Sequence, residues 1–109
     1  MNNIIFSIES INDLEKIKFY LEEELHNHLS GDKIVTKIIQ SIKKIKSFPH
    51  LGKELSKVVN FKTNYRYLIC CNYYIFYYVE NNYIYVTRII HCSRNYISIL
   101  FLNPSLQAG

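Results

Sequence analysis

The chain has 109 residues, of which 49% are hydrophobic and 20% charged, and its formal net charge is +4. This length and balance are typical of one globular domain with a single modest core, and they exclude a disordered chain. The mild positive charge permits an anionic partner without requiring one. We therefore expect a single domain over residues 1–109, with residues 103–109 as a frayed tail.

The first half of the chain predicts a strand followed by a helical hairpin. Residues 3–8 form a short β-prone run. Ser10 suits a helix N-cap, and apolar residues then recur at spacings of three and four up to residue 29. Ser30-Gly31-Asp32 is interpreted as the end of this helix and the cap of a second, over residues 33–46. The short loop requires two antiparallel helices, packed through Ile17, Leu21, Ile38 and Ile42.

The second half predicts the sheet. Pro49 and Gly52 stop the helical pattern, and residues 53–64 are expected as a loop that leads into a strand. Runs rich in Tyr, Ile and Val then follow, separated at Asn72 and at Glu80-Asn81-Asn82, with Ile75 and Val86 expected in the core. Residues 91–101 leave the last strand and should contain a short helix.

These elements give an α+β fold of order β-α-α-β-β-β with a short C-terminal helix. The helical hairpin should cover one face of a twisted antiparallel sheet and leave the other face open, and residues 3–8 should pair with a strand from the C-terminal half.

Cysteine usage and hydropathy indicate the compartment. The three cysteines are an odd number and Cys70 and Cys71 are adjacent, so reduced thiols are expected rather than a disulfide framework. A zinc site from Cys70, Cys71, His91 and Cys92 would lack a CxxC pair, and we predict neither a metal nor another cofactor. No signal peptide or membrane-spanning run is evident, which predicts a cytoplasmic protein without membrane contact.

Five segments in order resemble the RelE/ParE superfamily, the toxins of type II toxin-antitoxin modules. After the N-terminal strand and helical hairpin come FPHLGKEL at 48–55, NYRYLI at 64–69, YYIFYYV at 73–79 and YVTRIIHCSRNY at 85–96. The resemblance covers about residues 4–101 and implies a toxin with a cognate antitoxin as its partner. Many relatives have Arg where Ser93 stands and Asp where Asn95 stands, so the charged cluster at this turn is thinner here.

The resemblance implies two different activities. Some relatives are ribosome-dependent mRNA endoribonucleases, whereas others, of the ParE type, bind DNA gyrase and poison it without catalysis. Of the two we favour RNA cleavage, with ribosome and mRNA as partners. A degenerate toxin that retains only antitoxin binding stays open as a third alternative, because of the thinner charged turn.

RNA cleavage without a metal determines which residues to expect in a site. Attack by the 2′-hydroxyl requires a base, an acid and cations that stabilise the phosphate. His91 suits proton transfer, and Lys53 and Lys57 suit contacts to backbone phosphates. The catalytic candidates are Arg66, Arg88, His91, Arg94 and Tyr96. In a ribonuclease, the first, third and fourth of these and at least one of the other two must converge within hydrogen-bond reach of one phosphate.

Each candidate also has a purely structural interpretation. Arg88 alternates with Val86 and Ile90 and would then pair with a helix carboxylate such as Glu22. His91 is three residues further on, so an ideal strand would point the two side chains to opposite faces unless it bends. A hydrogen-bonded core histidine and a core tyrosine at position 96 are the corresponding alternatives.

Overall fold

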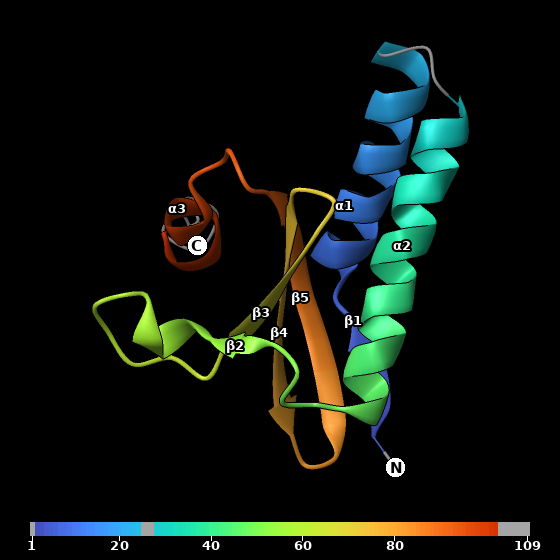
Figure 1. The fold of residues 1–109 in the computed structure, drawn as a ribbon. Helices are drawn as coiled ribbons and strands as arrows, with labels where there is room; N and C mark the ends of the chain where they lie inside the picture. Colours follow the sequence, from blue (N-terminus) through green and yellow to red (C-terminus); the bar gives the residue numbers. More distant parts are fainter. Residues whose placement is uncertain (1, 25–27, 103–109) are drawn as a thin grey trace.

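The computed structural model describes residues 2–24 and 28–102, so the expected frayed tail lies outside the described residues. Figure 1 shows a helical hairpin on one side of a sheet and a short helix on the other. The elements are β1 (Asn3–Phe6), α1 (Ile8–Phe19) with a π-helical continuation (Tyr20–Glu24), α2 (His28–Ser47), β2 (Lys53–Glu54) with a 3-10 turn (Leu55–Lys57), β3 (Arg66–Cys70), β4 (Tyr73–Glu80), β5 (Tyr83–His91) and α3 (Tyr96–Phe101). No helix in these ranges is long and apolar enough to cross a membrane.

The sheet has the strand order β1-β5-β4-β3-β2. The N-terminal strand pairs with the C-terminal half as predicted, from Asn3 opposite Tyr83 to Phe6 opposite Val86, but this pair is parallel. All other neighbours are antiparallel. The sheet is therefore mixed rather than antiparallel. It has five strands rather than four, because the segment expected as a loop contributes the two-residue strand β2.

Both hairpin turns lie where asparagines interrupt the apolar runs. Cys71 and Asn72 have φ angles of 53° and 68°, and Asn81 and Asn82 have 51° and 67°. Two consecutive left-handed residues are the signature of a type I′ turn, whose twist matches that of the flanking strands. The predicted breaks between β3 and β4 and between β4 and β5 are both confirmed.

The helical hairpin differs from the expectation at its ends. Ser7, not Ser10, caps α1, because its Oγ accepts the Ser10 N–H at 3.0 Å. Ser10 is fully buried and donates its own hydroxyl to the Ser7 carbonyl at 2.8 Å. Gly31 lies inside α2 rather than ending a helix. A Cβ at Gly31 would lie 2.9 Å from Glu22 Cγ, so this glycine serves the close approach of the two helices.

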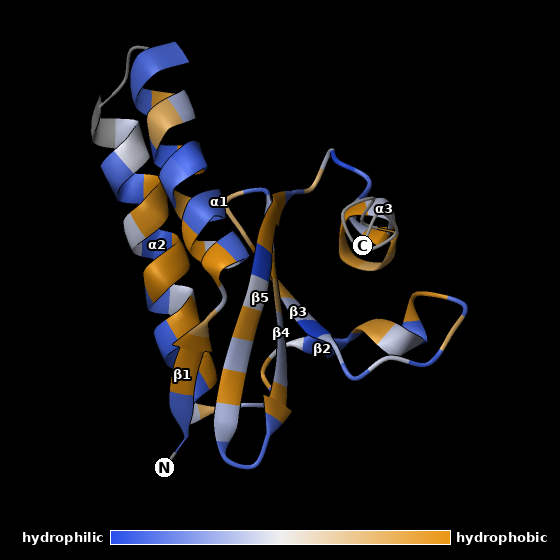
Figure 2. Cartoon of the chain, turned by 180° about the vertical axis from the view of Figure 1, so that it is seen from behind, coloured by the Kyte–Doolittle hydropathy of each residue, from blue (hydrophilic) through white to orange (hydrophobic). Residues whose placement is uncertain are grey.

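Two hydrophobic cores lie on opposite faces of the sheet. The helix-side core contains all six residues expected to be buried, namely Ile17, Leu21, Ile38, Ile42, Ile75 and Val86. The other face, expected to be open, carries a second core around Leu55, Phe76 and Ile90, against which aromatic and aliphatic side chains of α3 pack. Figure 2 shows α3 on the side of the sheet away from α1 and α2. The expectation of an open face was wrong, because the six-residue helix folds back onto it.

Candidate functional site

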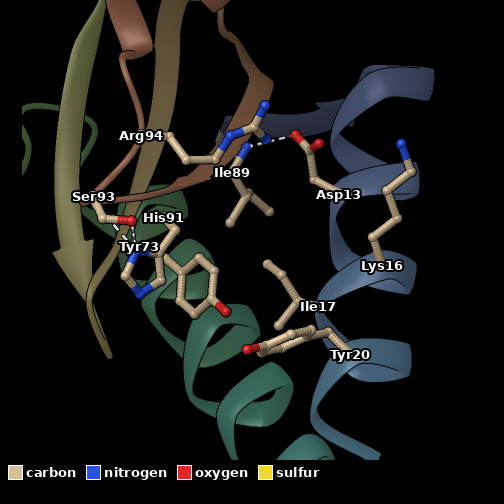
Figure 3. Close-up of a pocket in the computed structure, with 9 residues that line it drawn as sticks. All are labelled: Asp13, Lys16, Ile17, Tyr20, Tyr73, Ile89, His91, Ser93 and Arg94. Carbon is tan, nitrogen blue, oxygen red and sulfur yellow. Dashed lines mark hydrogen bonds between the residues drawn. The ribbon is translucent and has the colours of Figure 1, made fainter. Parts of the chain in front are cut away.

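A pocket of about 430 Å³ lies between α1 and the end of β5 (Figure 3). This volume falls within the usual range of ligand sites. Two of the sequence candidates, His91 and Arg94, line it together with residues of α1 and β4. The lining residues are Asp13, Lys16, Ile17, Tyr20, Tyr73, Ile89, His91, Ser93 and Arg94.

Asp13 binds the edge of β5 just beyond the point where β1 ends. One carboxylate oxygen accepts the Ile89 N–H at 2.9 Å and Arg88 Nε at 2.8 Å, and the other accepts Arg88 Nη2 at 3.0 Å. Hydrogen bonding to Asp13 raises the pKa of Arg88 above its usual value, against the opposing effect of burial. Arg88 is thus a structural arginine, as its alternative interpretation predicted, but its partner is Asp13 and not Glu22.

An irregularity in β5 determines which side chains share a face. The register shifts between Phe76 and Tyr77, so that Arg88 lies opposite Phe76 whereas Val86 lies opposite Tyr77. The alternation changes at this bulge, since Val86 before it and Ile89 after it both pack in the helix-side core. His91 therefore points to the helix side, as does Tyr73 opposite it. The shift lies before Arg88 and the register from Arg88 to His91 is regular, so these two side chains leave the strand on opposite faces, as an ideal strand requires.

His91 is oriented by the turn that follows it. Its Nδ1 accepts the Ser93 N–H at 3.1 Å and lies 2.8 Å from Ser93 Oγ. Since Nδ1 accepts from a backbone amide, the ring hydrogen in this arrangement is on Nε2. The ring also meets Tyr73 edge-on, with centroids 5.1 Å apart. Ser93 therefore holds the imidazole in place.

The pocket carries net positive charge. Arg94 follows the turn after β5, where its backbone N–H donates to the His91 carbonyl at 3.0 Å, and its side chain is exposed. Lys16 reaches the pocket from α1, and Figure 3 draws Lys16 and Arg94 on either side of Asp13. Because the charge of Asp13 is matched by Arg88, these two cations remain for a ligand.

Arg66 lies far from His91, although both project from the helix side of the sheet. Arg66 is opposite Tyr77 and His91 is opposite Tyr73, four residues apart on β4. Strand spacings place them about 13 Å apart along the strands and about 10 Å apart across them. Arg66 instead donates Nη1 to the Gly52 carbonyl at 2.7 Å. The convergence expected for a ribonuclease site is not found.

The two candidate RNA-binding lysines lie beside Arg66 rather than beside His91. Lys53, Lys57 and Arg66 line one shallow pocket together with Glu54. Glu54 neutralises part of this group, because it lies 3.0 Å from Lys57 Nζ and 3.9 Å from Arg66 Nη2. The Lys57 hydrogen bond holds the pKa of Glu54 below its usual value.

Tyr96 lies on the opposite face of the sheet. Its ring centroid is 5.1 Å from that of Tyr74 and 5.2 Å from that of Phe76, within the second core. The core interpretation of Tyr96 therefore describes its environment. Arg88 is held in an ion pair, so only His91 and Arg94 of the five catalytic candidates line the pocket.

Sequence reasoning missed the α1 side of the pocket. Asp13 lies on the buried side of α1 with Ser10 and Ile17. A carboxylate at a core-facing position is a signal for a buried ion pair, because an unpaired charge there would be costly. Tyr20 and Lys16 carry no comparable signal in the sequence.

The comparisons with known proteins agree with this architecture. The model of the family described as ParE toxin of type II toxin-antitoxin system, parDE, matches residues 4–96. A solved structure described as the chromosomal ParDE TA system from P. aeruginosa is similar in fold, with a TM-score of 0.70 and 18% sequence identity, over 84% of this chain and 96% of that one. No curated protein sequence matches. The family match spans most of the chain, which therefore belongs to the ParE toxin family of type II toxin-antitoxin systems.

Proposed function

We propose that this toxin acts by binding DNA gyrase in the cytoplasm, without catalysis of its own, and that a cognate antitoxin neutralises it. The family match points to the ParE type and away from the ribosome-dependent ribonuclease that the sequence favoured. A binding toxin needs no convergent acid, base and phosphate clamp. It needs an exposed surface that its target recognises.

The separation of the candidate catalytic groups is the observation that carries this proposal. A scissile phosphate must be gripped and protonated by groups within hydrogen-bond reach of its oxygens. Arg66 is two strands away from His91, Arg88 is occupied by Asp13, and Tyr96 lies across the sheet. The pocket offers the cations Lys16 and Arg94 beside His91, but none of the other candidates joins them as the second proton-transfer group that RNA cleavage requires.

The gyrase assay tests the proposal directly. Purified toxin is added to gyrase and plasmid, and supercoiling together with linear DNA is followed on gels. The same preparation is added to a translation reaction, whose mRNA ends are mapped. We expect loss of supercoiling or accumulation of linear DNA, and intact mRNA. Codon-phased mRNA cuts would overturn the proposal.

Two substitutions separate the mechanisms. His91→Gln and Arg66→Ala should leave the gyrase effect within about twofold of the unsubstituted toxin, because neither would carry chemistry. A ribonuclease would instead lose about 100-fold or more of its activity with His91→Gln, if that residue transferred a proton. Absence of growth arrest on expression in a bacterium would favour the degenerate toxin over both.

The outer face of α1 is our candidate for the antitoxin contact. Ile8, Ile11 and Phe19 are 75%, 45% and 62% exposed. Together with Glu15, they are spaced by three and four residues, so they form one stripe along α1. Side chains of this size rarely stay exposed in a row without a partner. Phe19 and Lys16 line a shallow groove on this helix. An apolar side chain beside a cation suits an apolar antitoxin segment that carries acidic residues.

Substitution on this stripe tests the antitoxin contact. Ile11→Asp should weaken antitoxin binding at least tenfold and leave growth arrest by the free toxin unchanged. Gln40→Asp, which changes the charge by the same single unit at an exposed position of α2, is the matched control and should bind normally. Unchanged affinity of Ile11→Asp, measured by calorimetry, would move the contact elsewhere.

A further inference from the structure

The turn between β3 and β4 places two thiols side by side. Cys70 is the last residue of β3, and Cys71 is the first residue of the two-residue turn. Their sulfur atoms are 3.8 Å apart, and both side chains pack against the edge of the helix-side core. We propose that Cys70 and Cys71 form a dithiol site that binds one monosubstituted trivalent arsenical.

The backbone conformation of Cys71 is unusual for its residue type. Its φ of 53° lies in the left-handed region, which Asn and Gly enter readily and other residues enter at a cost of about 1 kcal/mol. The equivalent position in the β4–β5 turn is occupied by Asn81. Conformations of this kind gather at sites with a function beyond folding. Here the conformation accompanies the close approach of the two sulfur atoms.

The geometry suits a bridging atom better than a disulfide. A disulfide requires sulfur atoms about 2.05 Å apart and Cα atoms at least about 4.4 Å apart, whereas adjacent residues are held at about 3.8 Å. A soft centre that bonds each sulfur at a typical length of about 2.3 Å can span up to twice that distance. The observed 3.8 Å falls within this reach without backbone movement.

The number of sulfurs selects the class of centre. A zinc ion in a structural site takes four ligands. Among residues 2–24 and 28–102, no three His, Cys, Asp or Glu side chains are grouped to hold a metal, so the zinc quartet considered from the sequence is not assembled. An arsenic(III) that already carries one carbon needs only two further bonds. Two thiols satisfy it completely.

The reaction is balanced without an oxidant. An arsenous oxide of the form R–As=O combines with the two S–H groups, two As–S bonds form, and the oxygen leaves as water with both thiol protons. Arsenic and sulfur keep their oxidation states. Burial raises the pKa of Cys71, and the charge of Lys37 on α2 opposes that effect.

The dithiol adjoins the pocket through Tyr73. Cys70 lies opposite Tyr73 across the β3–β4 pair, and Tyr73 in turn lies opposite His91. The turn is also bonded to the end of β5, because the Cys92 N–H donates to the Asn72 carbonyl at 2.8 Å. Because Tyr73 itself lines the pocket, a group bound at the dithiol lies next to one of the lining residues.

Phenylarsine oxide is the probe for the test. The folded full chain is incubated with it in excess monothiol, and the bound phenylarsenic group is counted by intact mass. We expect one group per chain, released by a dithiol competitor. Cys92→Ser should behave like the unsubstituted chain. From Cys70→Ser and Cys71→Ser, roughly 100-fold less monothiol should release the phenylarsenic group, because a single thiol cannot chelate the arsenic.

Three results would overturn the proposal. These are retention of the group in Cys70→Ser or Cys71→Ser, its loss in Cys92→Ser, and no adduct on the unsubstituted chain. Where a serine variant fails to fold, thermal unfolding of the unsubstituted chain decides. Adjacent cysteines also bind arsenicals in an unfolded chain. The probe therefore raises Tm only if the folded chain binds it more tightly than the unfolded chain does. An unchanged or lowered Tm contradicts the site.

Discussion

The face of the sheet beneath the helical hairpin is packed mostly by aliphatic side chains, whereas the face beneath α3 is packed mainly by aromatic rings. Ile38, Ile42 and Ile45 on α2 are almost completely buried, but no residue of α3 is. Aliphatic side chains interlock with a long helix, whereas several of the rings meet edge to face, and all of the rings except Phe76 keep part of their surface in water. The helix side should therefore hold the fold, and the aromatic side should open first.

The largest effect should come from the helix-side core. Ile42→Ala removes a side chain that is 1% exposed and leaves a cavity between α2 and the sheet. We expect a loss of about 4 kcal/mol in the free energy of unfolding, measured by denaturant titration. The exposed neighbour Lys43 provides the control, since Lys43→Ala should change stability by less than about 0.5 kcal/mol. A loss below about 1 kcal/mol for Ile42→Ala would remove the distinction between the two faces.

The Asp13–Arg88 pair should rank next. Asp13→Asn keeps the side-chain size but removes the charge that Arg88 faces, and the two side chains are only 10% and 20% exposed. We expect a loss of about 3 kcal/mol, because a largely buried guanidinium is left without its counter-charge. Glu15→Gln, an exposed change on the same helix, should be neutral within about 0.5 kcal/mol. Equal stability of the two variants would show that the pair is not needed for folding.

A smaller effect should come from the aromatic side. Phe101 packs edge-on against Phe61 and Tyr65, with ring centroids 4.8 and 5.7 Å away. Phe101→Ala should cost about 2 kcal/mol, less than for a fully buried Phe, and should raise amide exchange in α3 before the rest of the chain. Leu102→Ala, at a 57% exposed position, is the control. Uniform loss of protection across both faces would contradict independent opening of α3.

The smallest effect should appear at high pH and should involve both faces. Burial raises the pKa of four tyrosines of β4 above the usual 10.0. Tyr73 and Tyr77 face the helix side, and Tyr74 and Tyr78 face the other side. The unfolded chain then loses these protons first, so the contribution of these tyrosines to stability is intact below about pH 10 and falls as pH rises beyond it. Urea unfolding at pH 9 and pH 11 measures the loss. Tyr77→Phe should reduce the loss of unfolding free energy between pH 9 and pH 11, and an unchanged loss would contradict the assignment.

The parts of the fold predicted from sequence are those fixed by local periodicity. The isoleucine stripe of α2 and the Asn-rich turns depend only on neighbouring residues, and both were located correctly. Gly31 was misread because a glycine that permits close helix packing and one that ends a helix look the same in sequence. Strand β2 was missed because its two residues pair only when Arg66 and Tyr67 lie beside them.

The candidate site was harder to predict, because it depends on long-range placement. The bulge that turns His91 toward the helix side is a property of the β4–β5 register and leaves no mark in either strand alone. Arg66 was grouped with His91 because nothing in the sequence specifies how far apart two strands of one sheet place their side chains. Asp13 could have been recognised as the partner of a strand arginine from its position on the buried side of α1.

The parallel pairing of β1 with β5 also affects how the chain can be made. β5 lies between β1 and β4, so the strand that joins the two halves of the sheet leaves the ribosome after both of its neighbours. Until Tyr83–His91 has emerged, β1 has no partner, and Asp13 has neither Arg88 nor the Ile89 amide to bind. Contacts between residues this far apart in sequence form slowly. The toxin should therefore not reach its active fold until most of the chain has been synthesised. A chain that stops before Tyr83 should be degraded rather than active.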